Sequence, residues 1–177
     1  MAVSAVRPWT LQDLERMPDD GNKYEVVRGD LFVTPAPSYW HQLIVARLAP
    51  LLTPYVLEHK LGMVFQARSI VRRRGSETEP DLYVCDIAPR RDWDDAPAPL
   101  LVVEVHSRST RRRDLKQKRA FYLEDAGIPE YWMVDRESRS IRVARAVGDD
   151  TVVSERMTWH PPTASRPLDF AVARLFD

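Results

Sequence analysis

A short apolar run, Leu100–His106, is interrupted by one acidic residue, Glu104. The apolar residues before Glu104 are typical of a strand that lies deep in a sheet. A carboxylate buried there loses its hydration and needs a charged partner or a metal ion to compensate. Glu104 is therefore the leading candidate for chemistry. The alternative is a strand-end acid that caps the helix expected to begin near Thr110.

A second strand is expected over Asp81–Asp86, and it begins with an acid directly after Pro80. A side chain at a strand start often lies beside the end of a neighbouring strand. Asp81 and Glu104 together predict a divalent-metal site, because Mg²⁺ takes hard oxygen ligands and needs only one or two protein carboxylates. The carbonyl oxygen of Val105 could complete the shell, and Mn²⁺ could substitute for Mg²⁺. Taken alone, Asp81 is an ordinary turn aspartate.

Helix and strand patterns in turn predict a mixed α/β fold in one domain that covers residues 1–177. Strands are expected at Lys23–Val27, Leu31–Val33, Met63–Arg74, Asp81–Asp86, Leu100–His106, Tyr131–Asp135, Ile141–Ala146 and Val152–Met157. Helices are expected at Thr10–Met17, Ser38–His59 and Thr110–Ala126. The first two strands form a hairpin through Gly29, and Pro50 should kink or divide the central helix. The remaining expectations are loops at Gly75–Thr78 and Pro89–Pro99 and a final edge strand or turn at Leu168–Phe176.

Basic side chains follow Glu104 on the third expected helix. At about 100° per residue, Leu115 and Tyr122 belong to the inward stripe of that helix. Lys118 lies beside this stripe, as does Arg119, whereas Lys116 points away from it. We therefore favour Lys118 over Lys116 as the lysine that stabilises a phosphodiester transition state. The alternative is a solvated basic helix face.

Three further residues could support the acid pair. Strand alternation puts Glu25 on one face with Lys23 and Val27, and by itself Glu25 is an ordinary strand acid. His41 near the start of the central helix and His106 shortly after Glu104 could touch phosphate or metal. A hydrogen-bonded structural role is the alternative for each histidine.

Arginines form two dense basic runs, at Arg72–Arg74 and at Arg108 with Arg111, Arg112 and Arg113. Arginine binds phosphate through its bidentate fork. Because the second run begins close to Glu104, its four arginines are the expected nucleic-acid-binding residues, and they would track the backbone rather than read bases. The alternative is solvated surface.

The formal net charge is +0, so the whole molecule has no basic field that would concentrate nucleic acid. A content of 44% hydrophobic and 29% charged residues is typical of a globular protein, and no window reaches the roughly 18 apolar residues of a membrane span. Cys85 is the one cysteine, which excludes an internal disulfide and favours a reducing compartment, the cytoplasm. The histidine spacing does not suit structural zinc.

Four ordered motifs resemble the PD-(D/E)XK nuclease superfamily and, more narrowly, its bacterial putative restriction endonuclease family, long catalogued as a domain of unknown function. They are Tyr24–Asp30, Glu79–Val84, Val103–Asp114 and Gly127–Asp135. The resemblance implies a restriction-endonuclease-like core, a mixed β-sheet flanked by α-helices, with an additional N-terminal hairpin and C-terminal strands.

The resemblance also implies roles for single residues. Asp81 and Glu104 match the metal-binding places, and Glu25 matches the upstream acidic place. The superfamily pattern has lysine two residues after the second acid, where this sequence has His106. In the narrower family the lysine lies on the following helix, and Lys118 matches that place.

Residues and resemblance together suggest a Mg²⁺-dependent endonuclease that cleaves DNA with a metal-activated water. Nucleases of this fold often cut two strands as homodimers, so a homodimer is expected by analogy. The hypothesis of a different class is a catalytically weak or inactive nuclease-fold module that binds nucleic acid or protein. Zero net charge and the displaced lysine favour that alternative.

Overall fold

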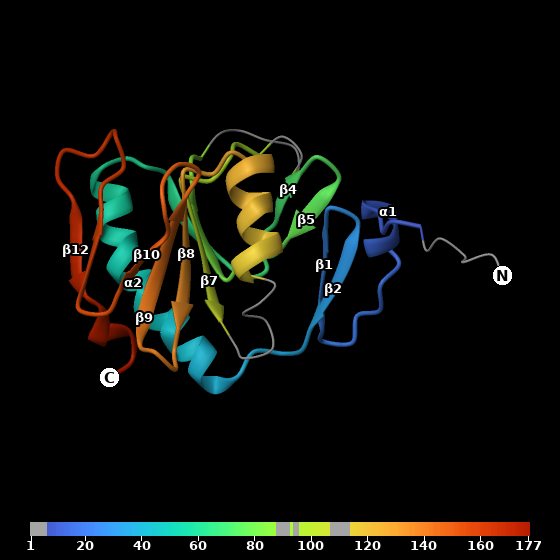
Figure 1. The fold of residues 1–177 in the computed structure, drawn as a ribbon, viewed down its shortest axis with the longest axis horizontal. Helices are drawn as coiled ribbons and strands as arrows, with labels where there is room; N and C mark the ends of the chain where they lie inside the picture. Colours follow the sequence, from blue (N-terminus) through green and yellow to red (C-terminus); the bar gives the residue numbers. More distant parts are fainter. Residues whose placement is uncertain (1–6, 88–92, 94–95, 107–113) are drawn as a thin grey trace.

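The structure is a computed structural model that describes residues 7–87, 93, 96–106 and 114–177. A six-stranded mixed sheet forms its centre, with a long helix on one face and the helical segment of residues 114–125 on the other (Figure 1). A four-stranded sheet that contains the N-terminal hairpin and a pair of C-terminal strands complete the fold. The predicted mixed α/β class is confirmed.

The strands of the central sheet lie in the order β10-β9-β8-β7-β6-β3. β7 and β8 are parallel, and the other neighbouring pairs are antiparallel. Their bounds are Met63–Gln66 (β3), Leu82–Cys85 (β6), Leu101–His106 (β7), Glu130–Asp135 (β8), Ser140–Arg145 (β9) and Thr151–Val153 (β10). Four of these, β6 to β9, confirm predicted strands to within one residue at each end.

Successive side chains of β7 face opposite sides of the central sheet. Val103 and Val105 pack in the hydrophobic cluster that includes α2 (Tyr39–Glu58), whereas Val102 packs in the cluster on the opposite face. By the same alternation Glu104 points to the side of Val102, which residues 114–125 cover (Figure 1). The strand is buried except at its last residue, so it places a carboxylate inside the protein.

α2 is one continuous helix, so of the kink or division predicted near Pro50 the division does not occur. Its buried residues include Ile44, Leu48, Leu52 and Val56, which recur every four positions and pack in the cluster with the central sheet. Each such side chain contributes about 1.5–3 kcal/mol when buried. Together they outweigh the cost of about 3 kcal/mol for a proline inside a helix.

Residues 114–125 form two π-helical turns, η1 (Asp114–Lys118) and η2 (Phe121–Asp125), joined by two α-helical residues. A helix was predicted over Thr110–Ala126, and residues 110–113 of that range lie outside the described residues. The π turn uses i→i+5 hydrogen bonds and winds more widely than an α-helix. Lys118 lies fully inside, whereas uniform α-helical spacing put it at the flank of the inward stripe.

The second sheet has the order β2-β1-β5-β4 and is antiparallel throughout. Its strands are Lys23–Val27 (β1), Asp30–Thr34 (β2), Val71–Arg73 (β4) and Ser76–Thr78 (β5). The predicted first hairpin is confirmed: its turn residues Arg28 and Gly29 have φ of 54° and 85°. Positive φ at both turn positions matches the twist of the flanking strands.

The predicted strand over Met63–Arg74 and the predicted loop over Gly75–Thr78 are both wrong. The chain leaves β3 at Gln66, re-enters a different sheet as β4, and returns as β5. Arg74 and Gly75, with φ of 49° and 75°, form a second Arg-Gly turn that repeats the first. The sequence therefore contained the same hairpin signal twice.

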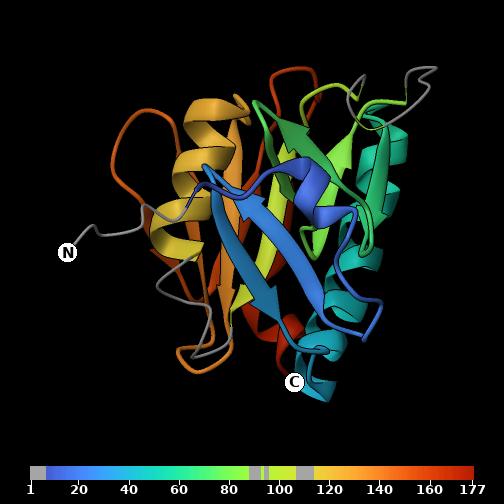
Figure 2. The same cartoon turned by 90° about the vertical axis from the view of Figure 1, so that its right-hand side faces the viewer.

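The peripheral elements lie at the two ends of the molecule. Helix α1 (Leu11–Leu14) is shorter than predicted, and Thr10 and Asp13 cap it reciprocally as expected. At the other end β11 (Arg156–Trp159) pairs with β12 (Leu168–Ala171), which the 3₁₀ helix η3 (Val172–Leu175) follows. Figures 1 and 2 show β1 and β2 on the side of the central sheet away from β12.

The strand predicted over Val152–Met157 is wrong, because the chain bends after β10 and Met157 belongs to β11 of a separate sheet. Of the loop predicted over Pro89–Pro99, residues 93 and 96–99 are the part that the structure describes. Among the described helices, none has the length and apolar character that crossing a membrane requires.

Candidate active site

Four of the residues singled out in the sequence meet on the side of the central sheet that residues 114–125 cover. Glu25 comes from the middle of β1, Asp81 immediately precedes β6, Glu104 lies on β7, and Lys118 ends η1. Leu82 pairs with Val103 across β6 and β7, so Asp81 and Glu104 occupy the next positions of the same antiparallel register. All four side chains are buried.

Lys118 joins two of the acids. Its Nζ lies 2.8 Å from Glu25 Oε1 and 2.6 Å from Glu104 Oε1. The side chain of Lys118 is 0% exposed, so both ion pairs are shielded from water. Tyr122, one turn further along, donates its hydroxyl to Glu104 Oε1 at 2.8 Å. One carboxylate oxygen of Glu104 therefore accepts both a charged and a neutral hydrogen bond.

Asp81 is held by different partners. His41 Nε2 lies 2.9 Å from Asp81 Oδ2, and the backbone N–H of Val105 donates to the same oxygen at 2.7 Å. Lys23 Nζ lies 3.8 Å from the other oxygen, Oδ1. Burial alone would raise the pKa of Asp81, but the His41 hydrogen bond and the charges of Lys23 and His41 outweigh it and lower the pKa to about 2. Asp81 is ionised at neutral pH.

Glu104 behaves in the opposite way. Burial raises its pKa to about 7, the charges of Lys118 and Lys23 work against that rise, and the charges of Asp81 and Glu25 add to it. Burial also raises the pKa of Tyr122 well above its usual value, so its hydroxyl keeps the proton that it donates to Glu104. The site thus pairs one fully ionised acid with one poised near neutrality, a pattern common at functional sites.

Lys23 is a site residue that the sequence reasoning missed as such. Its Nζ donates to the backbone oxygen of Glu79 at 2.8 Å and lies 3.9 Å from Glu25 Oε1, besides its approach to Asp81. The side chain of Lys23 is 17% exposed, in contrast to the enclosed Lys118. Strand alternation already placed Lys23 on the face of Glu25, and that was the signal that could have identified it.

Tyr122 and Glu79 were also missed. Tyr122 was assigned to the apolar stripe of its helix, which hid the hydroxyl at its tip. The backbone N–H of Glu79 donates to Glu25 Oε1 at 2.9 Å, and burial raises the pKa of the Glu79 carboxyl. Glu79 directly precedes the Pro-Asp pair in the sequence, and this spacing was the available signal.

The remaining predicted residues are His106, the arginines of the two basic runs, and Lys116 and Arg119 of the third predicted helix. His106 ends β7 in register with Asp135. Lys116 is exposed, and Arg119 pairs with Asp150 at 2.9 Å. The predicted nucleic-acid-binding residues Arg108, Arg111, Arg112 and Arg113 lie outside the described residues. Arg72 forms an ion pair with Glu77.

The donor set of the cluster suits a divalent cation. In the described part of the chain, no group of three or more His, Cys, Asp and Glu side chains is arranged to hold a metal ion. Mg²⁺ needs only one or two protein carboxylates beside water and phosphate. The hydrogen bonds from His41 and from the Val105 N–H both engage Asp81 Oδ2, so Oδ1 is the oxygen that could bind a cation. A cation beside Glu104 would favour the charged form of its carboxyl group. Asp81 and Glu104 are therefore the residues that could hold the ion.

Comparisons with known proteins agree with this description. The sequence model of the Uma2 family, described as "Putative restriction endonuclease", matches residues 11–173. A crystal structure of a putative nuclease belonging to DUF820 from Anabaena variabilis has a TM-score of 0.78 and 20% sequence identity, covering 96% of this chain and 98% of that chain. Among curated proteins none matches. The predicted nuclease fold and the predicted family are confirmed, and the chain belongs to the Uma2 family of putative restriction endonucleases.

Proposed function

We propose that the protein is an endonuclease that hydrolyses phosphodiester bonds in DNA and depends on Mg²⁺, for which Mn²⁺ can substitute. The observation that carries this proposal is the placement of Asp81 and Glu104 at adjoining positions of neighbouring strands, with Lys118 bonded to Glu104. Membership of a putative restriction endonuclease family supports it.

Each side chain has a definable task in this proposal. Bound at Asp81 and Glu104, Mg²⁺ would supply a more acidic water and offset the charge on the phosphoryl group. Asp81 offers Oδ1 while His41 and the Val105 N–H hold Oδ2 in place. The carbonyl of Val105 is a further candidate oxygen.

Lys118 and Glu25 support Glu104 in this mechanism. Lys118 is bonded to both Glu104 and Glu25, so it holds the two carboxylates close together and contributes positive charge beside them. Glu25 holds the other side of the Lys118 ammonium and so keeps it oriented. Lys23, which is more exposed than Lys118, could contact a phosphate bound beside Asp81.

Supercoiled plasmid tests the proposal most directly. Purified protein is incubated with plasmid in Mg²⁺, in Mn²⁺ and in chelator, with Asp81→Ala and Glu104→Ala alongside. We expect metal-dependent nicking that both variants lose and that Glu155→Ala, which removes an exposed acid, retains. Nicking that persists unchanged in both site variants would refute the site assignment.

A module that binds without cleaving is the second candidate, and the enclosure of Lys118 favours it. Lys118 is 0% exposed and is engaged by Glu25 and Glu104, so it does not reach a substrate in this conformation. Binding of DNA in chelator, with no cleavage in either metal and no effect of Glu104→Ala, would support the module and contradict the enzyme.

A homodimer and a cytoplasmic location belong to the same proposal. Two copies would present two sites, one for each strand of a duplex. Light scattering of the purified protein would give twice the mass of the 177-residue chain, and a monomeric mass with full duplex cleavage would contradict the dimer. The buried thiol of Cys85, the one cysteine of the chain, suits a reducing compartment.

A further inference from the structure

Two large aromatic side chains stand exposed at the start of α2. Tyr39 is 72% exposed and Trp40 is 43% exposed, and their ring centroids lie 5.5 Å apart in an edge-on arrangement. The remaining large side chains of this helix mostly face the core. Exposed aromatic rings next to each other are costly in water unless they serve a contact.

The rings adjoin the candidate active site. Trp40 is followed by His41, whose Nε2 lies 2.9 Å from Asp81 Oδ2. The aromatic pair therefore directly precedes, in the chain, the residue whose side chain contacts Asp81.

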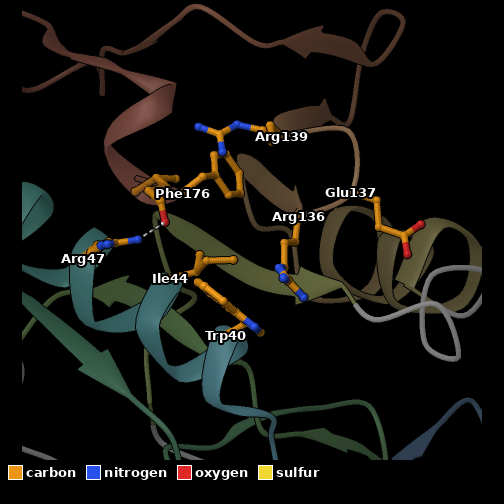
Figure 3. A pocket seen from close by; sticks show the side chains of 8 residues that line it. Trp40, Ile44, Arg47, Arg136, Glu137, Arg139 and Phe176 are labelled. Atoms are coloured by element: carbon orange, nitrogen blue, oxygen red, sulfur yellow. Dashed lines mark hydrogen bonds between the residues drawn. The ribbon is translucent and has the colours of Figure 1, made fainter.

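An arginine covers one ring. The guanidinium carbon of Arg136 lies 4.4 Å from the centroid of Trp40, and among the described residues Arg136 has no ion pair. Figure 3 shows Arg136 extending towards Trp40, and both side chains line a pocket of about 240 Å³. On the far side of the pocket Arg139 lies over the ring of Phe176.

The two other arginines of the pocket, Arg47 and Arg139, are hydrogen-bonded near the end of the chain. Arg139 pairs with Asp177, and Arg47 donates to the backbone oxygens of Leu175 and Asp177. Arg136 is the cation whose described contact is an aromatic face rather than an acid. An anion entering the pocket would therefore meet Arg136 first.

We propose that Tyr39, Trp40 and Arg136 form a stacking platform for an unpaired base, and that the substrate of the site is single-stranded nucleic acid or a strand unpaired near the cut. Aromatic rings and guanidinium planes stack on bases whose faces are free, which a duplex interior does not offer. The neutral net charge agrees, because affinity must then come from local contacts rather than a broad field. This inference rests on the proposed nuclease function.

Fluorescence anisotropy in chelator tests the platform without any cleavage. The probes are a fluorescein-labelled oligo-dT strand and a mixed-sequence duplex of equal length. We expect Tyr39→Ala and Trp40→Ala each to weaken binding of the single strand about tenfold and to leave duplex binding nearly unchanged. Leu57→Ala is the control, since Leu57 is 52% exposed on the same helix. Thermal melts verify that the variants fold.

Arg136→Gln separates the charge from the rings. Arg136 also brings positive charge next to the strand, so this variant should make log affinity fall less steeply with log salt, by about 0.7 for a single strand. Single-strand binding that is unchanged in Tyr39→Ala and Trp40→Ala overturns the platform, as does an equal loss for strand and duplex.

The plasmid assay keeps this result separate from the nuclease proposal. Metal-dependent cleavage together with normal single-strand binding by both aromatic variants refutes the platform alone. Aromatic-dependent strand binding without cleavage of either the plasmid or a single-stranded circular DNA in any metal refutes the enzyme and leaves the platform standing.

Discussion

Lys118 shares one ammonium group between two buried carboxylates, those of Glu25 and Glu104. Such an arrangement is costly to desolvate and stable only while every partner is present. Removing the lysine leaves two acids in the interior with less compensating charge. The side chains proposed for chemistry are therefore also part of what holds β1, β7 and η1 together.

Replacing Lys118 tests that dependence. We expect Lys118→Met to lower the free energy of unfolding by about 3–5 kcal/mol, because it leaves Glu25 and Glu104 buried without their nearest cation. Urea denaturation in chelator measures the change. Lys116→Met is the matched control on the same turn, and since Lys116 is exposed its effect should stay within about 0.5 kcal/mol. Equal stabilities of the two variants would contradict the prediction.

The pKa of Glu104 predicts a pH dependence of stability. Since burial raises this pKa from 4.5 to about 7, the folded state holds a proton that the unfolded state releases across that window. Stability in chelator should therefore fall as pH rises from about 4.5 to 7, by up to about 1.4 kcal/mol per pH unit. Denaturation at a series of pH values measures the slope.

Glu104→Gln supplies the comparison, because the amide does not titrate. The variant should lose this part of the slope, and an unchanged slope would assign it to other groups. Asp81 acts with the opposite sign: its lowered pKa contributes stability that is lost as pH falls from 3.8 towards 2.

Residue chemistry explains which parts of the cluster could be predicted. Glu104 and Asp81 stood out because acids in apolar strands need a compensating charge. Lys23 did not, because a lysine near a strand start is usually solvated and only the tertiary fold brings Asp81 within 3.8 Å of it. Tyr122 was counted as apolar because its hydrogen-bond partner, Glu104, lies on another element and only the tertiary fold brings the two together.

At the scale of elements, tight turns decide how the two sheets connect. Arg28-Gly29 and Arg74-Gly75 place two successive residues at positive φ and fold β1–β2 and β4–β5 into hairpins. The first was predicted because apolar strands flank it, whereas the second lies among arginines that obscure the strand pattern. The continuity of α2 past Pro50 was also unpredicted, because the burial that outweighs the proline is a tertiary effect.

A glycine after α2 offers a test at this scale. A Cβ at Gly62, where φ is +110°, would lie 2.0 Å from the backbone oxygen of Cys85 on β6. Gly62→Ala should therefore cost several kcal/mol more than Gly148→Ala, which shares positive φ but has no atom within 4 Å of the added Cβ. Urea denaturation of both variants measures the difference. Similar losses would show that backbone strain alone sets the cost.

At the scale of the molecule, one sheet serves two hydrophobic clusters. The side chains of β7 and β8 alternate between the cluster of α2 and the cluster of residues 121–126. If the sheet separated from one cluster, the apolar side chains of the other cluster would also become exposed to water. One domain over residues 1–177 was predicted from the length of the chain and from the lack of a repeat or a long linker.

Unfolding should accordingly be one transition. We expect thermal or urea unfolding followed by near-UV and far-UV circular dichroism to give coincident curves, because both clusters depend on the same strands. Ala144, on the sheet in the second cluster, and Val143, in the first, give matched probes. Val143→Ala and Ala144→Gly should each shift the whole curve; a second transition in either would contradict the single domain.

The bond between Lys118 and Glu25 joins residues separated by 93 positions in the chain. A ribosome releases Glu25 and Asp81 long before Lys118 emerges, and β8, which supports Glu104 from the far side, emerges later still. Until then the acids face water as separate charges and no shared ammonium exists to organise them. The growing chain therefore carries no assembled site, and the site forms only when synthesis of the fold is nearly finished.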